Sequence, residues 1–193
     1  MSRLTPSSEE QAPRDVEAAA KPAALDAETV EALFRECGGD VHGYAISLLG
    51  DRASAEDVTA LAFERLYRSR SRLDPRRGTP RAWLFAIARN AALDELRRRR
   101  RQPDYELESE LTADRDCAEA LERVARRATV RDALAGLPLR ERETVLLKFY
   151  GQLSNGELAQ ALGISESNAG TRLHRALTRL RERCLQIDRQ EVA

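Results

Sequence analysis

The sequence predicts an all-α protein of two small helical domains joined by a flexible acidic linker, with a helix-turn-helix in the second domain. Three observations support this: apolar residues recur at helical spacing, capping residues precede these segments, and charge changes sign in blocks along the chain. The 193 residues, 42% of them hydrophobic, suffice for two small cores. The expected divisions are a disordered tail at 1–25, a first domain at 26–101, the linker at 102–127, a second domain at 128–187 and a tail at 188–193.

The formal net charge is zero, yet the charges are unevenly distributed. Residues 1–64 carry 5 basic and 13 acidic side chains, whereas residues 65–101 carry 13 basic and 3 acidic ones. The sign then reverses twice, with 1 basic and 8 acidic side chains in 102–122 and 13 basic and 7 acidic in 123–189. Because basic side chains neutralise phosphates, the two basic blocks predict two separate contacts with nucleic acid.

In the first domain, helical patterning begins at Asp26. Ser54 followed by Asp57 is typical of a helix start, and this helix is expected to run to about Arg68. After a loop, Thr79-Pro80 supplies a capping hydroxyl and the residue favoured at the first helical position. A long basic helix is therefore expected to begin there.

One side of this basic helix forms an apolar stripe that should face a core, made of Leu84, Ile87, Ala88 and Ala91. An adjacent face carries polar and aromatic groups at helical spacing: Trp83, Asn90, Asp94, Arg97 and Arg101. Arginines can hold phosphates while an amide reads a base edge and an aromatic ring supports an unstacked base. A structural interpretation stays open for each group. Trp83 can pack against the core instead of contacting DNA, and the arginine run at 97–101 can be a solvated helix end near the negative pole of the helix dipole.

The second domain carries a more specific pattern, which starts at Leu137-Pro138 with an amphipathic helix through Tyr150. Capping residues then mark a short helix and the start of a long one: Ser154 with Glu157 as a capping box, Gly163 as the helix end and Ser165 as the next cap. The buried side of the long helix is expected to consist of Ala169, Leu173, Ala176, Leu177 and Leu180. A helix, a tight turn and a second helix form a helix-turn-helix.

An adjacent face of this last helix is lined by Asn168, Arg172, Arg175, Arg179 and Arg183. The amino end of such a helix fits the major groove, where amide and guanidinium groups distinguish base edges. Asn168 and Arg172 are therefore candidates for base contacts, with Ser165 at the turn. Arg175 and Arg179 are candidates for phosphate contacts, unless these arginines only keep the surface soluble. His174 has no second ligand at metal-binding spacing and is interpreted as a bystander.

The composition argues against several other classes of protein. The three cysteines, Cys37, Cys117 and Cys184, lie far apart and form no CxxC pair, so neither a disulfide framework nor a zinc site is indicated. The acidic residues cluster in the tail and the linker without a histidine motif, which argues against a metal-dependent nuclease. The sequence also shows no secretory signal and no long apolar stretch. We therefore expect a cytoplasmic protein without membrane insertion, catalytic residues, metal or cofactor.

Several of these motifs resemble regions two and four of the extracytoplasmic-function sigma factors of bacterial RNA polymerase. The first region is similar in Ala55-Glu56-Asp57-Val58, in Phe63, in the segment 83–90 and in the arginine-rich helix end. The second is similar in Leu137-Pro138, in Gly163-Ile164-Ser165 and in the segment 172–176. Together the similarities cover roughly residues 28–101 and 128–184.

This resemblance implies a sigma factor that binds core RNA polymerase, directs it to promoter DNA and helps to open the duplex. Region two would bind the polymerase through Asp57 and Phe63 and capture the minus-ten element, while region four would read the minus-thirty-five duplex. The region-two DNA contacts would come from Arg76, Arg77, Trp83, Asn90, Arg97, Arg98 and Arg101. The loop 74–79 would trap a flipped base, which opens DNA without hydrolysis. The resemblance also implies that the acidic linker lies in the RNA path of the polymerase and that an anti-sigma factor clamps both domains.

Two departures from the family pattern bear on these expectations. Ala60-Leu61 stands where the polymerase-binding motif usually has a glutamine and an acidic residue. Asn168-Ala169-Gly170 stands where the recognition helix usually has Thr-Val and a basic residue, and glycine in a helix costs up to about 1 kcal/mol relative to alanine. Ala60-Leu61 leaves open a degenerate sigma-like protein that binds polymerase weakly or not at all. A stand-alone helix-turn-helix regulator is a separate alternative, which explains only half of the charge pattern.

Overall fold

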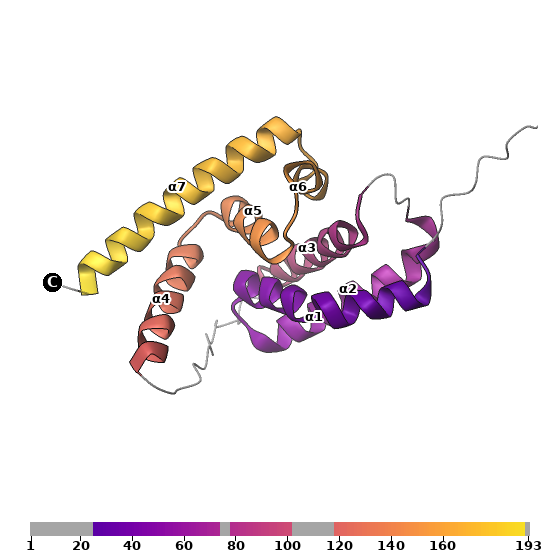
Figure 1. The fold of residues 1–193 in the computed structure, drawn as a ribbon, viewed down its shortest axis with the longest axis horizontal. Coiled ribbons are helices and arrows are strands. Elements are labelled where there is room, and N and C mark those ends of the chain that lie inside the picture. The colour runs from indigo at the N-terminus through magenta and orange to yellow at the C-terminus, as the bar shows by residue number, and fades with distance from the viewer. Residues whose placement is uncertain (1–24, 74–77, 102–117, 192–193) are drawn as a thin grey trace, which may run out of the picture.

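A computed structural model describes residues 25–73, 78–101 and 118–191, and for residues 118–126 it describes the backbone only. Every regular element in these ranges is helical (Figure 1). The first domain contains α1 (Ala27–Leu49), α2 (Arg52–Ser69), the 3-10 turn η1 (Arg70–Arg72) and α3 (Pro80–Arg99). The second contains α4 (Ala118–Ala135), α5 (Leu139–Tyr150), α6 (Asn155–Leu162) and α7 (Glu166–Glu191). The prediction of an all-α protein with two small helical domains is confirmed.

Helix starts in the first domain follow local capping chemistry. Asp26 caps α1 by accepting a hydrogen bond from a first-turn backbone amide at 2.7 Å, and Thr79 caps α3 with a proline at the first helical position. The prediction of Ser54 as a cap is wrong. Asp51 accepts a hydrogen bond from the Ser54 amide at 2.9 Å, so α2 begins before Ser54.

The helix-turn-helix of the second domain is confirmed as α6, a tight turn and α7. Ser154 and Glu157 form both arms of the predicted capping box at the start of α6. Gly163 ends α6 with φ of 66°, a left-handed conformation that favours glycine. The Ser165 hydroxyl then accepts a hydrogen bond from the Asn168 amide at 3.3 Å and caps α7.

Two predicted boundaries differ from the structure. Helix α4 begins at Ala118, inside the segment expected to be linker, because this alanine- and arginine-rich sequence has high helix propensity. Helix α7 continues to Glu191, through most of the segment expected to be a tail at 188–193. The predicted tail at 1–25, apart from its last residue, and the linker at 102–117 lie outside the described residues, as do Cys117, Arg76 and Arg77.

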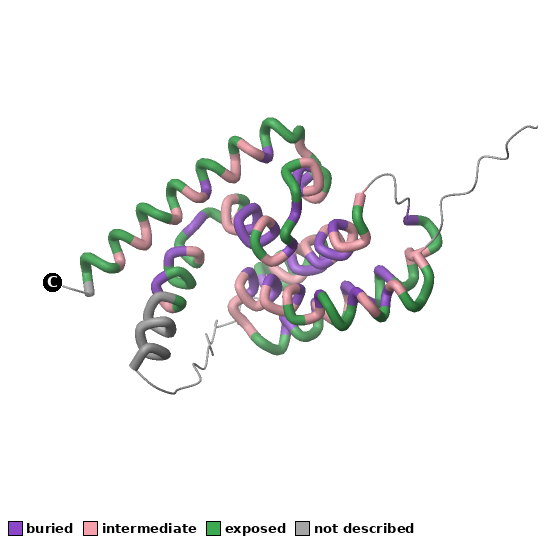
Figure 2. Tube along the Cα trace, in the orientation of Figure 1, coloured by how far each residue is buried: buried purple, intermediate pink, exposed green. Residues whose placement is uncertain are grey.

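A hydrophobic core runs continuously through both domains (Figure 2). The largest wholly buried side chains include Tyr44, Phe85, Leu66 and Leu84 in the first domain and Leu146, Leu147, Leu153 and Leu158 in the second. The predicted apolar stripe of α3 faces this core, with Ile87 only partly buried. Helices α5 and α6 therefore pack directly on α1 and α3.

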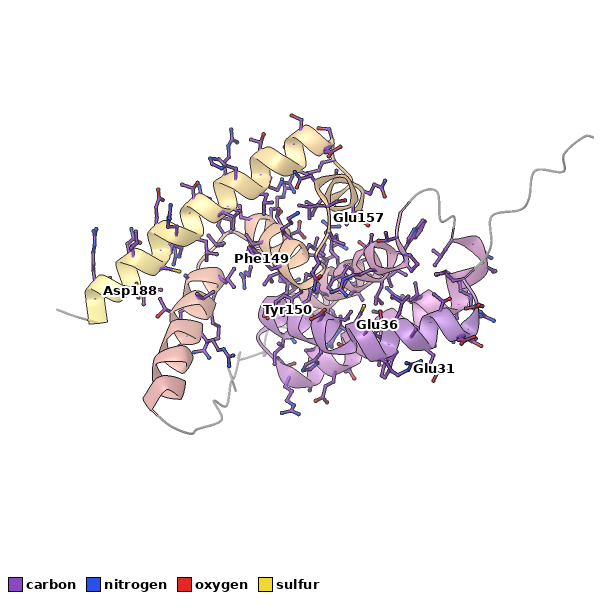
Figure 3. The ribbon with its side chains drawn as sticks, viewed as in Figure 1. Glu31, Glu36, Phe149, Tyr150, Glu157 and Asp188 are labelled. Carbon is purple, nitrogen blue, oxygen red and sulfur yellow. The ribbon has the colours of Figure 1, made fainter. Side chains whose placement is uncertain are left out.

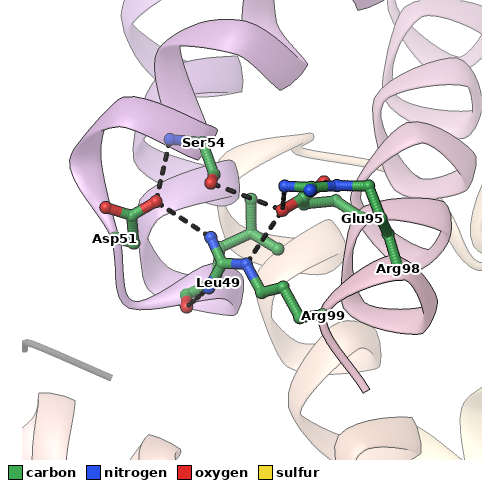
Figure 4. A network of polar contacts seen from close by, with 6 residues as sticks. All are labelled: Leu49, Asp51, Ser54, Glu95, Arg98 and Arg99. Atoms are coloured by element: carbon green, nitrogen blue, oxygen red, sulfur yellow. Dashed lines mark hydrogen bonds and ion pairs between the residues drawn. The ribbon is translucent and has the colours of Figure 1, made fainter. Parts of the chain in front are cut away.

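One of the five consecutive arginines at the end of α3 is buried, since the Arg99 side chain is only 7% exposed (Figure 4). Its guanidinium donates to the Leu49 carbonyl oxygen at 3.0 Å, to Asp51 at 2.9 Å and to Glu95 at 2.9 Å. Arg99 thereby ties the end of α3 to the turn between α1 and α2. The interpretation of the whole run as a solvated helix end is wrong for this residue.

The same network predicts a loss of stability in acid. Hydrogen bonds from Arg98 and Arg99 hold the pKa of Glu95 below its usual value although burial raises it, and hydrogen bonds from Ser54 lower the pKa of Asp51. Groups with lowered pKa stabilise the fold above their unfolded pKa of about 4, and this contribution disappears as the pH falls through the folded pKa. We expect urea unfolding of Glu95→Gln to show a shallower loss of stability between about pH 5 and pH 3 than the wild type.

The matched control is Glu56→Gln, which changes an exposed carboxylate in a surface pair with Arg52. This variant should keep the acid dependence of the wild type. Equal acid dependence in the wild type and Glu95→Gln would contradict the prediction.

Candidate nucleic-acid interface

The α3 face predicted to contact DNA is exposed at its carboxyl-terminal half and covered near its start. Asn90 and Arg101 are exposed, and Arg97 and Arg98 are more than half exposed. Trp83 is half-buried and packs against the core. This packing favours the structural interpretation of Trp83, while its contact with DNA stays a prediction.

Carboxylates on the same helix partly neutralise the exposed arginines of α3. Arg97 pairs with Asp94 at 2.8 Å, and Arg98 pairs with Glu95 at 2.7 Å. Asp94, Arg97, Arg98 and Arg101 line an open cleft of about 450 Å³. A phosphate entering this cleft would compete with the carboxylates for exposed arginines, which suits a reversible contact with a nucleic-acid backbone.

The amino-terminal half of α7 presents most of its predicted DNA contacts. Ser165, Asn168 and Arg175 are exposed and Arg172 is half-buried. Neither Arg172 nor Arg175 has an ion-pair partner within the described parts of the chain. These four side chains therefore remain accessible for a groove and its phosphates.

The arginines further along α7 are engaged by the protein itself. Arg179 forms an ion pair with Glu141 of α5. The Arg183 guanidinium lies so close to Gly136 that a Cβ there would be 1.8 Å from a guanidinium nitrogen. Arg183 therefore packs beside the end of α4 rather than extending the DNA face, which its helical spacing alone had suggested.

The glycine that departs from the family pattern has no packing role. A Cβ built on Gly170 would meet nothing within 4 Å among the described atoms. The residue lies in the second turn of α7, next to the candidate base-contacting side chains. Its effect is therefore a weaker helix and the loss of any side-chain contact from this position.

The surface predicted to bind polymerase includes aromatic residues that sequence reasoning missed. Asp57 and Ala60 are exposed on α2, whereas Phe63 is only 8% exposed. The Phe34 ring of α1 packs edge-on against Phe63, with ring centroids 4.9 Å apart, and is 57% exposed. Tyr67 is 46% exposed and lies one helical turn after Phe63 on α2. We call Phe34, Asp57, Ala60 and Tyr67 the aromatic face. The buried Phe63 ring contacts the Phe34 ring on the side that faces the protein interior.

A second group that the sequence did not reveal lies between the domains. Arg81 and Arg89 of α3 reach across to α5, where Arg89 pairs with the buried carboxylate of Glu143 at 3.2 Å. No periodic or motif signal distinguishes these arginines from surface arginines. Only the packing of α5 on α3 identifies them.

The described residues offer little for other chemistries. They contain no group of three or more His, Cys, Asp or Glu side chains that could hold a metal ion. Cys37 and Cys184 are free thiols, and burial raises the pKa of both. None of the described helices has the length and apolar character needed to cross a bilayer.

Comparison with known families identifies both domains. The model of Sigma-70 region 2 matches residues 33–102, and the model of Sigma-70, region 4 matches residues 127–180. The first match begins at Leu33 within α1 and extends beyond the end of α3. The second covers the end of α4, the helix-turn-helix and most of α7.

Individual relatives align over most of their length. The chain is 32% identical over 160 residues to the ECF RNA polymerase sigma factor SigL of Mycobacterium tuberculosis, covering 82% of this chain and 90% of SigL. It is 33% identical over 153 residues to the RNA polymerase sigma factor CarQ of Myxococcus xanthus, covering 79% of this chain and 87% of CarQ.

Solved structures show a similar fold. The sigma factor RpoE from Bartonella quintana, in complex with the anti-sigma factor NepR, has a TM-score of 0.67 at 22% identity, with coverage of 82% of this chain and 97% of RpoE. CnrH in complex with the cytosolic domain of CnrY has a TM-score of 0.59 at 25% identity, with coverage of 81% and 88%.

Proposed function

Since this chain belongs to the extracytoplasmic-function sigma factors, which direct RNA polymerase to specific promoters, we propose how its described surfaces divide that work. The observation that carries the assignment is the pair of region matches, in the order region 2 then region 4, on two domains of the corresponding fold. The first domain binds polymerase and the minus-ten element. The second binds the minus-thirty-five element.

The aromatic face is the proposed contact with core polymerase. Exposed aromatic side chains are enriched at the centres of protein interfaces because they bury large apolar areas. Phe34 and Tyr67 are exposed aromatic side chains of this kind, and Asp57 is an exposed carboxylate on the same helix as Tyr67. Phe63, for which the family resemblance implied a polymerase contact, acts here by holding the Phe34 ring in place.

The DNA contacts are divided between α3 and α7. Minus-ten binding is assigned to seven residues of the first domain: Arg76, Arg77, Trp83, Asn90, Arg97, Arg98 and Arg101. Minus-thirty-five binding is assigned to the start of α7: Ser165, Asn168, Arg172, Arg175 and Arg179. Trapping an extruded base offsets its unstacking cost of about a few kcal/mol, so promoter opening needs no catalytic group.

The partners follow from the same assignment. One solved structure named above holds the sigma factor RpoE with the anti-sigma factor NepR, and the other holds CnrH with the cytosolic domain of CnrY. This supports regulation of the present chain by an anti-sigma factor. The protein would act in the cytoplasm, where the polymerase transcribes, and as a binding factor rather than an enzyme.

The decisive experiment adds purified protein to bacterial core RNA polymerase and measures start-specific transcription from genomic DNA fragments. We expect initiation by the wild type and an affinity of Phe34→Ala for core polymerase lower by about 10-fold or more, since truncating a hot-spot residue of an interface costs about 2 kcal/mol or more. Phe149→Ala is the matched control, because Phe149 is also an exposed aromatic (63%) but lies on α5.

Three other outcomes would count against the proposal. Sequence-specific DNA binding without core polymerase, and no initiation with it, would favour a stand-alone regulator. Failure of the wild type to associate with core polymerase would favour a degenerate sigma-like protein and would implicate Ala60-Leu61. Equal losses in Phe34→Ala and Phe149→Ala would reject the aromatic face as the contact.

A further inference from the structure

A threonine near the start of α7 is exposed on the outer side of the helix. Thr171 lies about 200° around the helix from Ala169, which is wholly buried. Side chains project from this outer side of α7, which faces away from α5 (Figure 3). Asn168 and Arg172, the candidates for base contacts, lie on either side of Thr171 along the helix. The threonine therefore lies in the part of α7 that would enter a major groove.

The Thr171 hydroxyl already makes a hydrogen bond within the helix. It donates to the Ser167 backbone carbonyl oxygen at 3.0 Å. This bond restricts the side-chain rotamer and uses the only proton that the hydroxyl could donate to a phosphate oxygen. The side chain therefore offers DNA a methyl group and an oxygen that can only accept a hydrogen bond.

The exposed methyl group of Thr171 has one natural counterpart in DNA. Only thymine presents a methyl group in the major groove, and apolar contact with that group is a form of direct base readout. The other exposed side chains in the first two turns of α7, those of Glu166, Ser167 and Asn168, end in polar groups. Because the threonine side chain is short, a contact with thymine requires the α7 backbone to come close to the bases.

Gly170 permits this close approach. It precedes Thr171 and lies at the edge of the outer side, about 100° away around the helix. A Cβ there would meet nothing within 4 Å among the described atoms, so packing does not require a glycine, although glycine is less favourable than alanine in a helix. Glycine allows a backbone to approach a ligand closely. This edge of α7 therefore carries no side chain that would hold the helix away from DNA.

We propose that Thr171 selects a thymine in the minus-thirty-five element by contact with its 5-methyl group, and that Gly170 lets α7 sit deep enough for this contact. The inference rests on the proposed function, because it concerns the DNA bound by the same helix. It adds a specificity-determining residue to Asn168 and Arg172, whose amide and guanidinium suit adenine and guanine. The start of α7 would then read bases through one apolar and two hydrogen-bonded contacts.

The same helix carries a matched control two turns further on. Thr178 is also exposed, and its hydroxyl donates to the His174 backbone carbonyl oxygen at 3.0 Å. It follows Thr171 by seven residues, which correspond to about 10 Å along the helix. A helix that enters the groove with its amino end brings Thr171, and not Thr178, to the bases. The two threonines thus share their local geometry and differ in position.

The test uses the full-length protein bound to core polymerase and a promoter isolated with the wild-type protein. In this promoter each thymine of the upstream element is replaced, one at a time, by deoxyuridine, which lacks only the 5-methyl group. We expect one replacement to lower the affinity of the wild-type complex by about 4-fold, as for the loss of one buried methyl group. Competition binding with the unreplaced promoter measures each affinity.

Four variants identify the group that makes the contact. Thr171→Ser removes the methyl group and can keep the hydrogen bond to Ser167, so it should bind the replaced and unreplaced promoters equally. Thr171→Val keeps a methyl group and removes the hydroxyl, so it should retain the difference of about 4-fold. Thr178→Ser should behave like the wild type. Gly170→Lys should reduce the difference to less than about 2-fold, because its long side chain holds α7 away from the bases.

The proposal is overturned if no deoxyuridine replacement changes the affinity, or if Thr171→Ser keeps the sensitivity of the wild type. Loss of the sensitivity in Thr171→Val would assign the contact to the hydroxyl oxygen, and its loss in Thr178→Ser would place the contact elsewhere on α7. Unchanged sensitivity in Gly170→Lys would reject the role of the glycine. Failure of the proposed function looks different. In that case the wild type directs core polymerase to no start site, no promoter is isolated, and the inference falls with the function.

Discussion

Arg99→Met should lower the free energy of unfolding by about 2 to 3 kcal/mol. Breaking a buried ion pair typically costs about 3 to 5 kcal/mol, and partial solvent access to the remaining carboxylates reduces that cost. Asp51 and Glu95, which Arg99 contacts, are 24% and 14% exposed at their side chains. The Leu49 carbonyl oxygen would also lose the hydrogen bond that it accepts from Arg99 Nη1 at 3.0 Å. Urea unfolding followed by circular dichroism measures the change.

The neighbouring residue provides the control. Arg100 follows Arg99 at the end of α3 and is exposed, so Arg100→Met should change the stability by no more than about 0.5 kcal/mol. Equal effects of the two substitutions would show that position in the arginine run, rather than the contacts of Arg99, determines stability. The prediction would then be wrong.

The difference between these two arginines shows where sequence reasoning reaches its limit. Helical periodicity places all five arginines of the run 97–101 at a basic helix end. Arg99 alone is buried, because it contacts the turn between α1 and α2, which lies about fifty residues earlier in the chain. A local rule also misassigned the start of α2. Both Asp51 and Ser54 can cap a helix, and the sequence does not show that Ser54 lies against Glu95.

Signals confined to a few neighbouring residues were read correctly. The capping box at Ser154, the left-handed glycine at 163 and the cap at Ser165 define the helix-turn-helix from local backbone chemistry alone. These motifs position the candidate DNA contacts at the start of α7. They do not show which arginines of α7 contact other helices of the protein, as Arg179 and Arg183 do.

Contacts between distant segments were missed for a common reason. Arg89 and Glu143 look like surface residues because charged side chains are rarely buried unless paired, and pairing across domains leaves no sequence pattern. The sequence analysis made no prediction for Phe34. Aromatic residues are largely buried on average, and no sequence pattern marks the 57% exposure of this one. The division into two small helical domains was correct, while the packing of one domain on the other required the structure.

Promoter recognition by α7 should depend more strongly on Arg172 than on Arg179. Arg172 has no ion-pair partner within the described segments, so its guanidinium is available for a base edge, and a good bidentate contact to a base is worth about 1 to 3 kcal/mol. Arg172→Ala should therefore reduce transcription from a promoter isolated with the wild-type protein by about 10-fold to 100-fold at limiting factor concentration. Single-round transcription with core polymerase measures this loss.

Arg179→Ala is the matched comparison on the same helix. Arg179 already pairs with Glu141 of α5, so a phosphate must compete with that carboxylate and removal of the arginine should cost about a few-fold in transcription. A loss in Arg179→Ala as large as that in Arg172→Ala would contradict this ranking. It would mean that Glu141 releases Arg179 to the DNA and that the ion pair belongs to the free protein alone.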